Sequence, residues 1–243
     1  MSRITAAMIM GAGLGTRMRP LTDDRPKPLV MVGGRTLIDH AIDRLAAAGV
    51  TRIVVNLHYK AAMLRAHLEQ RRDVTILFSD ESERLLDTGG GVVKAMPLLG
   101  AEPFFVLNSD SIWIETGAPA LAAMQAHWDS DRMDGLLLLA EMATATGYEG
   151  AGDFILEADG RVARARGRNE TPHAYPGVQI VHPRLFADAP AGAFSTNILW
   201  DRAIAKGRLF GMMLHGVWIH VGTPQARDAG ERRLAAAPGR ARA

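Results

Sequence analysis

The chain contains 243 residues, of which 48% are hydrophobic and 22% are charged, as in an ordinary globular protein. It has no cysteine, which excludes disulfide frameworks, thiolate metal sites and cysteine nucleophiles. Its 28 basic and 26 acidic residues give a net charge of +2, too balanced to suggest a nucleic-acid-binding surface. No apolar run approaches the roughly 20 residues that span a membrane, and no signal-peptide cleavage pattern follows residues 4–10. We therefore expect a cytoplasmic protein without a membrane segment.

Strands and helices are predicted to alternate over the first 142 residues, because short apolar runs alternate with apolar residues at helical spacing. Strands are expected at 4–10, 52–57, 74–78, 104–108 and 135–142, and helices between them at 37–48, 60–71, 89–99 and 118–128. This order is typical of βαβ units in a mostly parallel sheet, whose ligands bind beyond the carboxyl ends of the strands. The loops after Met10 and Asn108 are therefore expected to lie close together.

The pattern changes after about Tyr148. Residues 153–163 are interrupted by Ala158-Asp159-Gly160, which predicts a hairpin. Further strands are expected at 174–181 and 217–221, and a helix is expected from about Thr223 to Ala236. Residues 238–243 are small and basic, as in a frayed chain end.

A glycine-rich loop follows the first predicted strand and is the most informative segment. It has the sequence Gly11-Ala12-Gly13-Leu14-Gly15-Thr16-Arg17, and Pro20-Leu21-Thr22 and Pro26-Lys27-Pro28 come soon after it. Glycines in such a loop allow backbone amides to approach phosphates closely. The dinucleotide-binding pattern fails because Thr16 replaces its third glycine and Asn56 replaces the acidic residue of the second strand. The P-loop pattern fails as well, so a nicotinamide-dependent oxidoreductase and a P-loop enzyme are both disfavoured.

The loop resembles that of the sugar-phosphate nucleotidyltransferases, with their G-x-G-T-R core, P-L-T segment and P-K-P segment. Similar segments follow along most of the chain: Asp87-Thr88-Gly89-Gly90-Gly91, Asn108-Ser109-Asp110, Gly152-Asp153-Phe154 and Trp218-Ile219-His220-Val221-Gly222-Thr223. The glycine triplet, the early Gly-Asp-Phe and the short chain resemble in particular the N-acetylmuramate alpha-1-phosphate uridylyltransferases. The resemblance implies a three-layer α/β/α Rossmann-like fold with a mostly parallel mixed sheet. It also implies one domain over residues 1–237, with a nucleotide-binding half (1–147) and a sugar-binding half (148–237).

The resemblance also implies the reaction. A nucleoside triphosphate, with UTP favoured, would be joined to a sugar 1-phosphate, with N-acetylmuramate 1-phosphate favoured, and pyrophosphate would be released in cell-wall recycling. Arg17 would hold the departing pyrophosphate, and Lys27 would neutralise the α-phosphate and the sugar phosphate. Asp110 would hold Mg²⁺, although an aspartate after a strand can also cap a helix. The residues implied to bind the nucleotide are Gly11, Ala12, Gly13, Gly15, Thr16, Arg17, Asp87, Thr88 and Gly89.

The late motif departs from the family pattern, because His220 stands where these enzymes usually have a second metal-binding aspartate. Imidazole is a poor ligand for Mg²⁺ and a better one for Mn²⁺ and other softer divalent ions. His220 could therefore ligate a softer ion or contact a substrate phosphate. It could also leave the metal to Asp110 and the phosphates, or be a packed side chain without a catalytic role.

The second half of the chain is implied to hold the sugar. Asp153 suits sugar hydroxyls or an amide, Gly177 leaves room for a ring, and Trp218 offers an apolar face, although each could equally serve the core or a turn. Asn169 lies in the polar segment 167–173, which could cover the sugar as a lid.

Two alternatives stay open. A mannose-1-phosphate guanylyltransferase or a related enzyme would use the same motifs with other substrates. A non-catalytic subunit that binds nucleotide sugars is favoured only by His220, whereas Arg17, Lys27 and Asp110 argue against it.

The short segment after Thr223 leaves no room for a β-helical extension, so we expect a monomer or a weak homodimer that binds small molecules and no nucleic acid.

Overall fold

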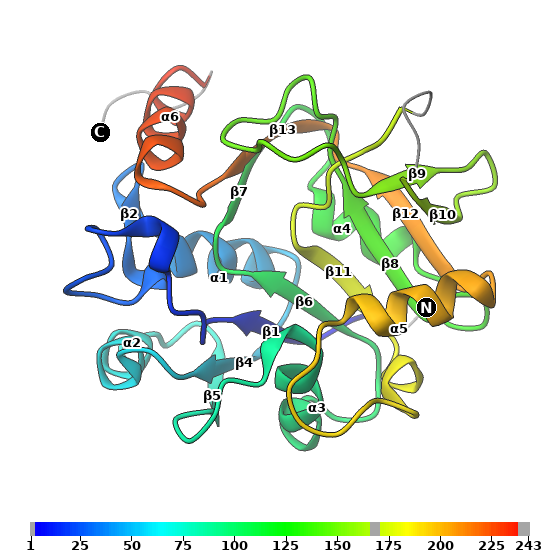
Figure 1. Ribbon diagram of the computed structural model, residues 1–243, viewed down its shortest axis with the longest axis horizontal. Coiled ribbons are helices and arrows are strands. Elements are labelled where there is room, and N and C mark those ends of the chain that lie inside the picture. Colours follow the sequence, from blue (N-terminus) through cyan, green and yellow to red (C-terminus); the bar gives the residue numbers. More distant parts are fainter. Residues whose placement is uncertain (1–2, 166–170, 238–243) are drawn as a thin grey trace.

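A computed structural model describes residues 3–165 and 171–237. Within them, seven strands form one sheet in the order β12-β8-β11-β6-β1-β4-β5 (Figure 1). These strands are β1 (Ala6–Met10), β4 (Arg52–Leu57), β5 (Thr75–Asp80), β6 (Phe104–Asn108), β8 (Gly135–Leu139), β11 (Val178–Val181) and β12 (Leu209–Met213). All neighbours in the described sheet pair in parallel except at β11, which runs antiparallel to both β6 and β8. The prediction of a mostly parallel mixed sheet is confirmed.

Helices cover both faces of this sheet, which gives three layers. On one face, α1 (Leu37–Ala47), α2 (Ala61–Leu68) and α4 (Ala120–His127) share a core with alternate strand residues such as Ile9, Ile53 and Leu107. On the other face, α3 (Asp87–Leu99) and α5 (Asn197–Ala205) share a core with the intervening residues such as Met8, Val54 and Val106. Both faces of the central strands are buried, which explains their continuous apolar sequences.

A smaller layer lies beyond the carboxyl ends of β1 and β6. There, β13 (Gly216–His220) pairs antiparallel with β7 (Ser111–Glu115), and α6 (Pro224–Ala235) packs against the ribbon together with the short hairpin of β2 (Met31–Val32) and β3 (Arg35–Thr36). Their shared core contains Met18 of the 3-10 helix η1 (Thr16–Met18), Ile219 and Leu234. This layer therefore holds the glycine-rich loop against the late sequence motif. A second 3-10 helix, η2 (Lys27–Leu29), follows the loop, and η3 (Pro183–Phe186) follows β11.

Local sequence explains most element boundaries. The side chains of Thr36 and Thr223 accept hydrogen bonds from the third residue of α1 and α6, and Gly49 ends the turn after α1 with a φ of 88°. The predicted hairpin is confirmed as β9 (Phe154–Leu156) and β10 (Val162–Arg164). The strand predicted at 174–181 is too long: it begins at Val178, because Pro176 has no amide to donate and Gly177 has a left-handed φ of 77°.

Among the described elements of five residues or more, β7, α5 and β12 were absent from the sequence prediction. The two-residue strands β2 and β3 and the 3-10 helices η1, η2 and η3 were absent as well. None of the helices in the described part of the chain has the length and hydropathy to span a bilayer. Residues 238–243, predicted as a frayed end, lie outside the described residues.

Candidate active site

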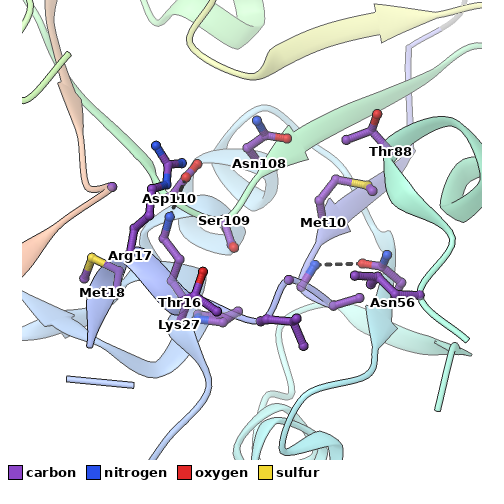
Figure 2. A pocket seen from close by; sticks show the side chains of 18 of the residues that line it. Met10, Thr16, Arg17, Met18, Lys27, Asn56, Thr88, Asn108, Ser109 and Asp110 are labelled. Carbon is purple, nitrogen blue, oxygen red and sulfur yellow. Dashed lines mark hydrogen bonds and ion pairs between the residues drawn. The ribbon is translucent and has the colours of Figure 1, made fainter. Parts of the chain in front are cut away.

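The carboxyl ends of β1 and β6 open onto a hollow of about 560 Å³ (Figure 2). The two strands are neighbours, with Met10 opposite Asn108, so the loops that follow them meet as predicted. The lining includes residues 10–18 of the glycine-rich loop, together with Lys27, Asn56, Thr88, Asn108 and Asp110. In Figure 2, the charged side chains of Arg17, Lys27 and Asp110 lie on one side of the hollow, and Met10, Asn56 and Thr88 lie on the other.

A buried polar network holds the start of the glycine-rich loop. The amide of Gly11 donates to Asn56 Oδ1 at 2.7 Å, and Asn56 Nδ2 donates to Glu81 Oε1 at 2.7 Å. The other carboxylate oxygen of Glu81 accepts a hydrogen bond from the Leu86 amide at 3.0 Å. The network therefore connects the glycine-rich loop to the segment that leads into Asp87 and Thr88. Sequence reasoning used Asn56 only to reject a dinucleotide site, and Glu81 was missed.

A charged cluster lies where the loop faces the end of β6. Lys27 Nζ is 2.6 Å from Asp110 Oδ2, and the two side chains are only 14% and 18% exposed. Burial raises the pKa of the Asp110 carboxyl, but the positive charge and hydrogen bond of Lys27 outweigh it and hold the pKa below its ordinary value. Asp110 occupies the turn between β6 and β7, so the alternative that it caps a helix is excluded.

His220 is brought beside this cluster by backbone pairing. The amide of Val221 donates to the carbonyl of Asp110 at 2.9 Å, which ties the end of β13 to the turn after β6. Burial lowers the pKa of His220, and the Asp110 carboxylate only partly offsets this effect. The imidazole is therefore neutral at pH 7 and can offer a nitrogen lone pair. Gly222 packs directly on the ring, since a Cβ there would lie 2.4 Å from His220 Nε2.

The donor set fits a divalent ion that takes most of its ligands from a substrate. Within the described residues, no group of three or more histidine, aspartate or glutamate side chains could enclose a metal ion. Asp110 lines the hollow and could offer one carboxylate, and His220, tied beside it through Val221, could offer one imidazole. Mg²⁺ is commonly held by one or two carboxylates plus phosphate oxygens, whereas an imidazole favours a softer ion.

The glycine triplet packs against a neighbouring loop. Asp87 and Thr88 line the hollow, whereas Gly89, Gly90 and Gly91 are buried. The amides of Gly89 and Gly90 donate to the carbonyl of Phe194, at 2.8 and 3.2 Å. A Cβ on Gly89 would lie 2.2 Å from the Phe194 ring, and one on Gly90 would lie 2.3 Å from the Gly192 carbonyl oxygen. This close packing explains why glycines are needed here without invoking the approach of a base.

A second hollow, also of about 560 Å³, adjoins the first, and Arg17, Asn108, Asp110 and Gly222 line both. Asp153 lies in its wall. Its Oδ2 accepts a hydrogen bond from the Tyr148 hydroxyl at 3.1 Å and another from the Tyr175 amide at 2.8 Å. Burial, with the nearby Asp153 carboxylate, raises the pKa of Tyr148 to about 12, so this hydroxyl stays a donor.

The other sugar-site candidates have different surroundings. Trp218 lines the second hollow but is only 2% exposed, and its indole N–H donates to Ser111 Oγ at 2.8 Å. The missing side chain of Gly177 makes room for the side chain of Asn108 and not for a sugar ring. A Cβ at Gly177 would lie 2.4 Å from Asn108 Nδ2. Asn169 and most of the predicted lid fall at 166–170, outside the described residues.

The sequence profile of the family described as nucleotidyl transferase matches residues 6–164 of this chain. The chain belongs to this family. It is 49% identical to an N-acetylmuramate alpha-1-phosphate uridylyltransferase from Caulobacter vibrioides, over 95% of this chain and 97% of that protein. It is also 35% identical to a protein of the same name from Neisseria meningitidis, over 89% and 93% of the two chains. The solved inositol-1-phosphate CTP transferase of T. maritima superposes with a TM-score of 0.77 at 16% identity, covering 95% and 96% of the two chains, which shows the shared fold.

These relatives identify the chain as a sugar-1-phosphate nucleotidyltransferase. The two hollows of this nucleotidyltransferase adjoin each other. One is lined by the glycine-rich loop and the other by residues of the second half, and the charged cluster lies at their junction.

Proposed function

We propose that this nucleotidyltransferase joins UTP to N-acetylmuramate alpha-1-phosphate and releases pyrophosphate. The observation that carries the reaction type is the junction of the two hollows at Arg17 and Asp110, with Lys27 paired to Asp110. The choice of substrates is supported by the identity, over nearly the whole chain, to relatives that bear this enzyme's name. The reaction uses a cytoplasmic triphosphate, and recycling of cell-wall sugar is the pathway that we propose for it.

In the proposed reaction, a phosphate oxygen of the sugar 1-phosphate attacks the α-phosphorus of UTP. A new P–O bond forms, the bond between the α- and β-phosphates breaks, and pyrophosphate leaves with the electron pair. No side chain needs to become covalently attached, so the protein contributes position and charge.

Each member of the cluster has a role in this scheme. Lys27 neutralises negative charge between the α-phosphate and the sugar phosphate, and its ion pair with Asp110 fixes the ammonium group at the junction. Arg17 presents a planar guanidinium for the leaving pyrophosphate. The backbone amides of residues 11–16 line the same hollow and would hold the triphosphate.

A divalent ion, when bound, would neutralise the triphosphate, and Asp110 and His220 are the side chains that would hold it. Because His220 is neutral and imidazole suits softer ions, we propose that Mn²⁺ supports the reaction at least as well as Mg²⁺.

The test is pyrophosphate release from the four nucleoside triphosphates, each combined with the 1-phosphates of N-acetylmuramate, N-acetylglucosamine, glucose and mannose, in Mg²⁺ and in Mn²⁺. We expect the highest kcat/KM for UTP with N-acetylmuramate 1-phosphate. A preference for GTP with mannose 1-phosphate would replace the proposed substrates, and no release from a folded protein that binds UTP would refute the proposed enzyme.

A further inference from the structure

A third hollow, of about 240 Å³, lies between the β9–β10 hairpin and the start of α5. These elements lie on the right of Figure 1, at the end of the sheet away from α2 and β5. The third hollow shares Asn108, Asp153 and Tyr175 with the second hollow and Thr88 with the first. A substrate that occupies the sugar side of the site can therefore extend a substituent into it.

Arg164, at the end of β10, is the one cation among the described residues that line this third hollow. Its guanidinium carbon lies 4.7 Å from the centre of the Phe154 ring and 5.7 Å from the Trp200 ring. Its Nε donates to Asp201 Oδ1 at 2.8 Å, and one terminal nitrogen donates to Asn197 Oδ1 at 2.9 Å. The side chain is only 22% exposed, so its position is set before any ligand arrives.

The other terminal nitrogen of Arg164, Nη1, makes no hydrogen bond to a described residue. The guanidinium therefore keeps donors for a ligand. Its contact with two aromatic rings helps to hold it in place, and its partial burial strengthens its attraction for an anion.

Gln179 adds a second set of donors to the same hollow. This buried residue lines it, and its side-chain oxygen accepts a hydrogen bond from the Trp200 indole N–H at 3.0 Å. An indole nitrogen only donates, so the amide of Gln179 must present its oxygen to Trp200 and keep its NH₂ group for another acceptor. Ser195 and Thr196 also line the hollow and carry hydroxyl groups.

We infer that this third hollow binds a carboxylate carried by the sugar substrate, with Arg164 as its charged partner. The inference rests on the proposed function: N-acetylmuramate differs from N-acetylglucosamine by a lactyl ether that ends in a carboxylate. Asp87 and Asp153, the carboxylates that also line this hollow, already accept hydrogen bonds from backbone amides and from Tyr148. Among the described residues, Asp201 pairs only with Nε of Arg164, so the terminal nitrogens of Arg164 are the charged donors left to receive a carboxylate. The same contact would make the enzyme select acidic over neutral amino sugars.

The experiment compares the wild type, R164Q and R161Q in steady-state kinetics with UTP. The substrates are N-acetylmuramate 1-phosphate and its analogue with the lactyl carboxylate converted to an amide. Arg161 is the matched control, because it lies on the same hairpin but is 51% exposed and pairs with Asp159 away from the hollow.

We expect the wild type to lose roughly 10- to 100-fold in kcat/KM when the carboxylate is replaced by the amide, mainly through KM. R164Q should show a loss of the same size with the natural substrate and little further loss with the amide, while its KM for UTP and the kinetics of R161Q stay unchanged. A wild type that uses acid and amide equally well overturns the inference, as does an R164Q that still prefers the acid.

The two proposals fail separately. Absence of turnover by the wild type with N-acetylmuramate 1-phosphate refutes the proposed substrate and the inference with it. Turnover without discrimination between acid and amide refutes the inference alone. If R164Q does not fold, R164K takes its place: it keeps the charge but loses the planar guanidinium, and should lose part of the preference for the acid.

Discussion

The ion pair between Lys27 and Asp110 is expected to stabilise the free protein as well as to serve the reaction. At an effective dielectric constant of about 20, unit charges 2.6 Å apart attract by about 6 kcal/mol, and desolvation of the two groups offsets much of this. Breaking a fully buried pair costs about 3–5 kcal/mol, and some exposure of both side chains reduces that value. We therefore expect K27M to lower the free energy of unfolding by about 2–3 kcal/mol, because Asp110 loses its partner.

The assay is a double-mutant cycle by urea denaturation, with wild type, K27M, D110N and the double variant. The double variant should be more stable than the sum of the single effects predicts, by about 1–2 kcal/mol, since neither charge is then left alone. The pKa of Asp110 is lowered in the folded state, so the contribution of the pair is complete above about pH 4, the ordinary value. It is lost as the pH falls through the lowered folded value, and the coupling should be equal at pH 7 and pH 5. Additive effects at pH 7, within about 0.5 kcal/mol, would refute the reasoning.

Three further predictions concern single residues. R17A should lower kcat/KM for pyrophosphate release by about 100-fold or more, and unchanged turnover would remove Arg17 from the reaction. H220D should shift the metal preference from Mn²⁺ toward Mg²⁺, and equal metal titration profiles for the two proteins would show that His220 is not a ligand. G90A should lower the free energy of unfolding by about 1–3 kcal/mol, because its Cβ would lie 2.3 Å from the Gly192 carbonyl oxygen; urea denaturation with unchanged stability would contradict this packing.

The architecture of the first half could be predicted because its elements are long and periodic. The strands at 52–57 and 104–108 have the predicted bounds, and α1 ends one residue early. The missed elements carry weaker local signals. β12 contains a central glycine, Gly211, whose missing side chain makes room for Val162 and Leu139. β7 begins directly after Asp110, and the short turn before it gives no sequence signal that a new strand starts. α5 has only nine residues.

The site could be predicted only as far as its motifs extend. The glycine-rich loop motif singled out Arg17 and Lys27 as candidates, the Asn108-Ser109-Asp110 segment singled out Asp110, and the fold brings them to one hollow. Contacts that depend on tertiary structure left no such signal. The bond from Asn56 to Glu81 joins residues 25 positions apart, and Arg164 meets α5 across 33 positions or more. Each pair lies within one half of the chain, and only the tertiary packing of its helices and strands brings the two residues together.

The reversed direction of β11 has a consequence for how substrate choice can diverge. The glycine-rich loop follows β1 and Asp110 follows β6, whereas Tyr175 and Gly177 reach the same edge of the sheet just before β11 begins. Because β11 runs opposite to β1 and β6, loops from separate stretches of sequence meet at this edge. Under the proposed function, substitutions in the loop before β11 are therefore expected to change the choice of sugar while the glycine-rich loop and its hydrogen bonds stay intact.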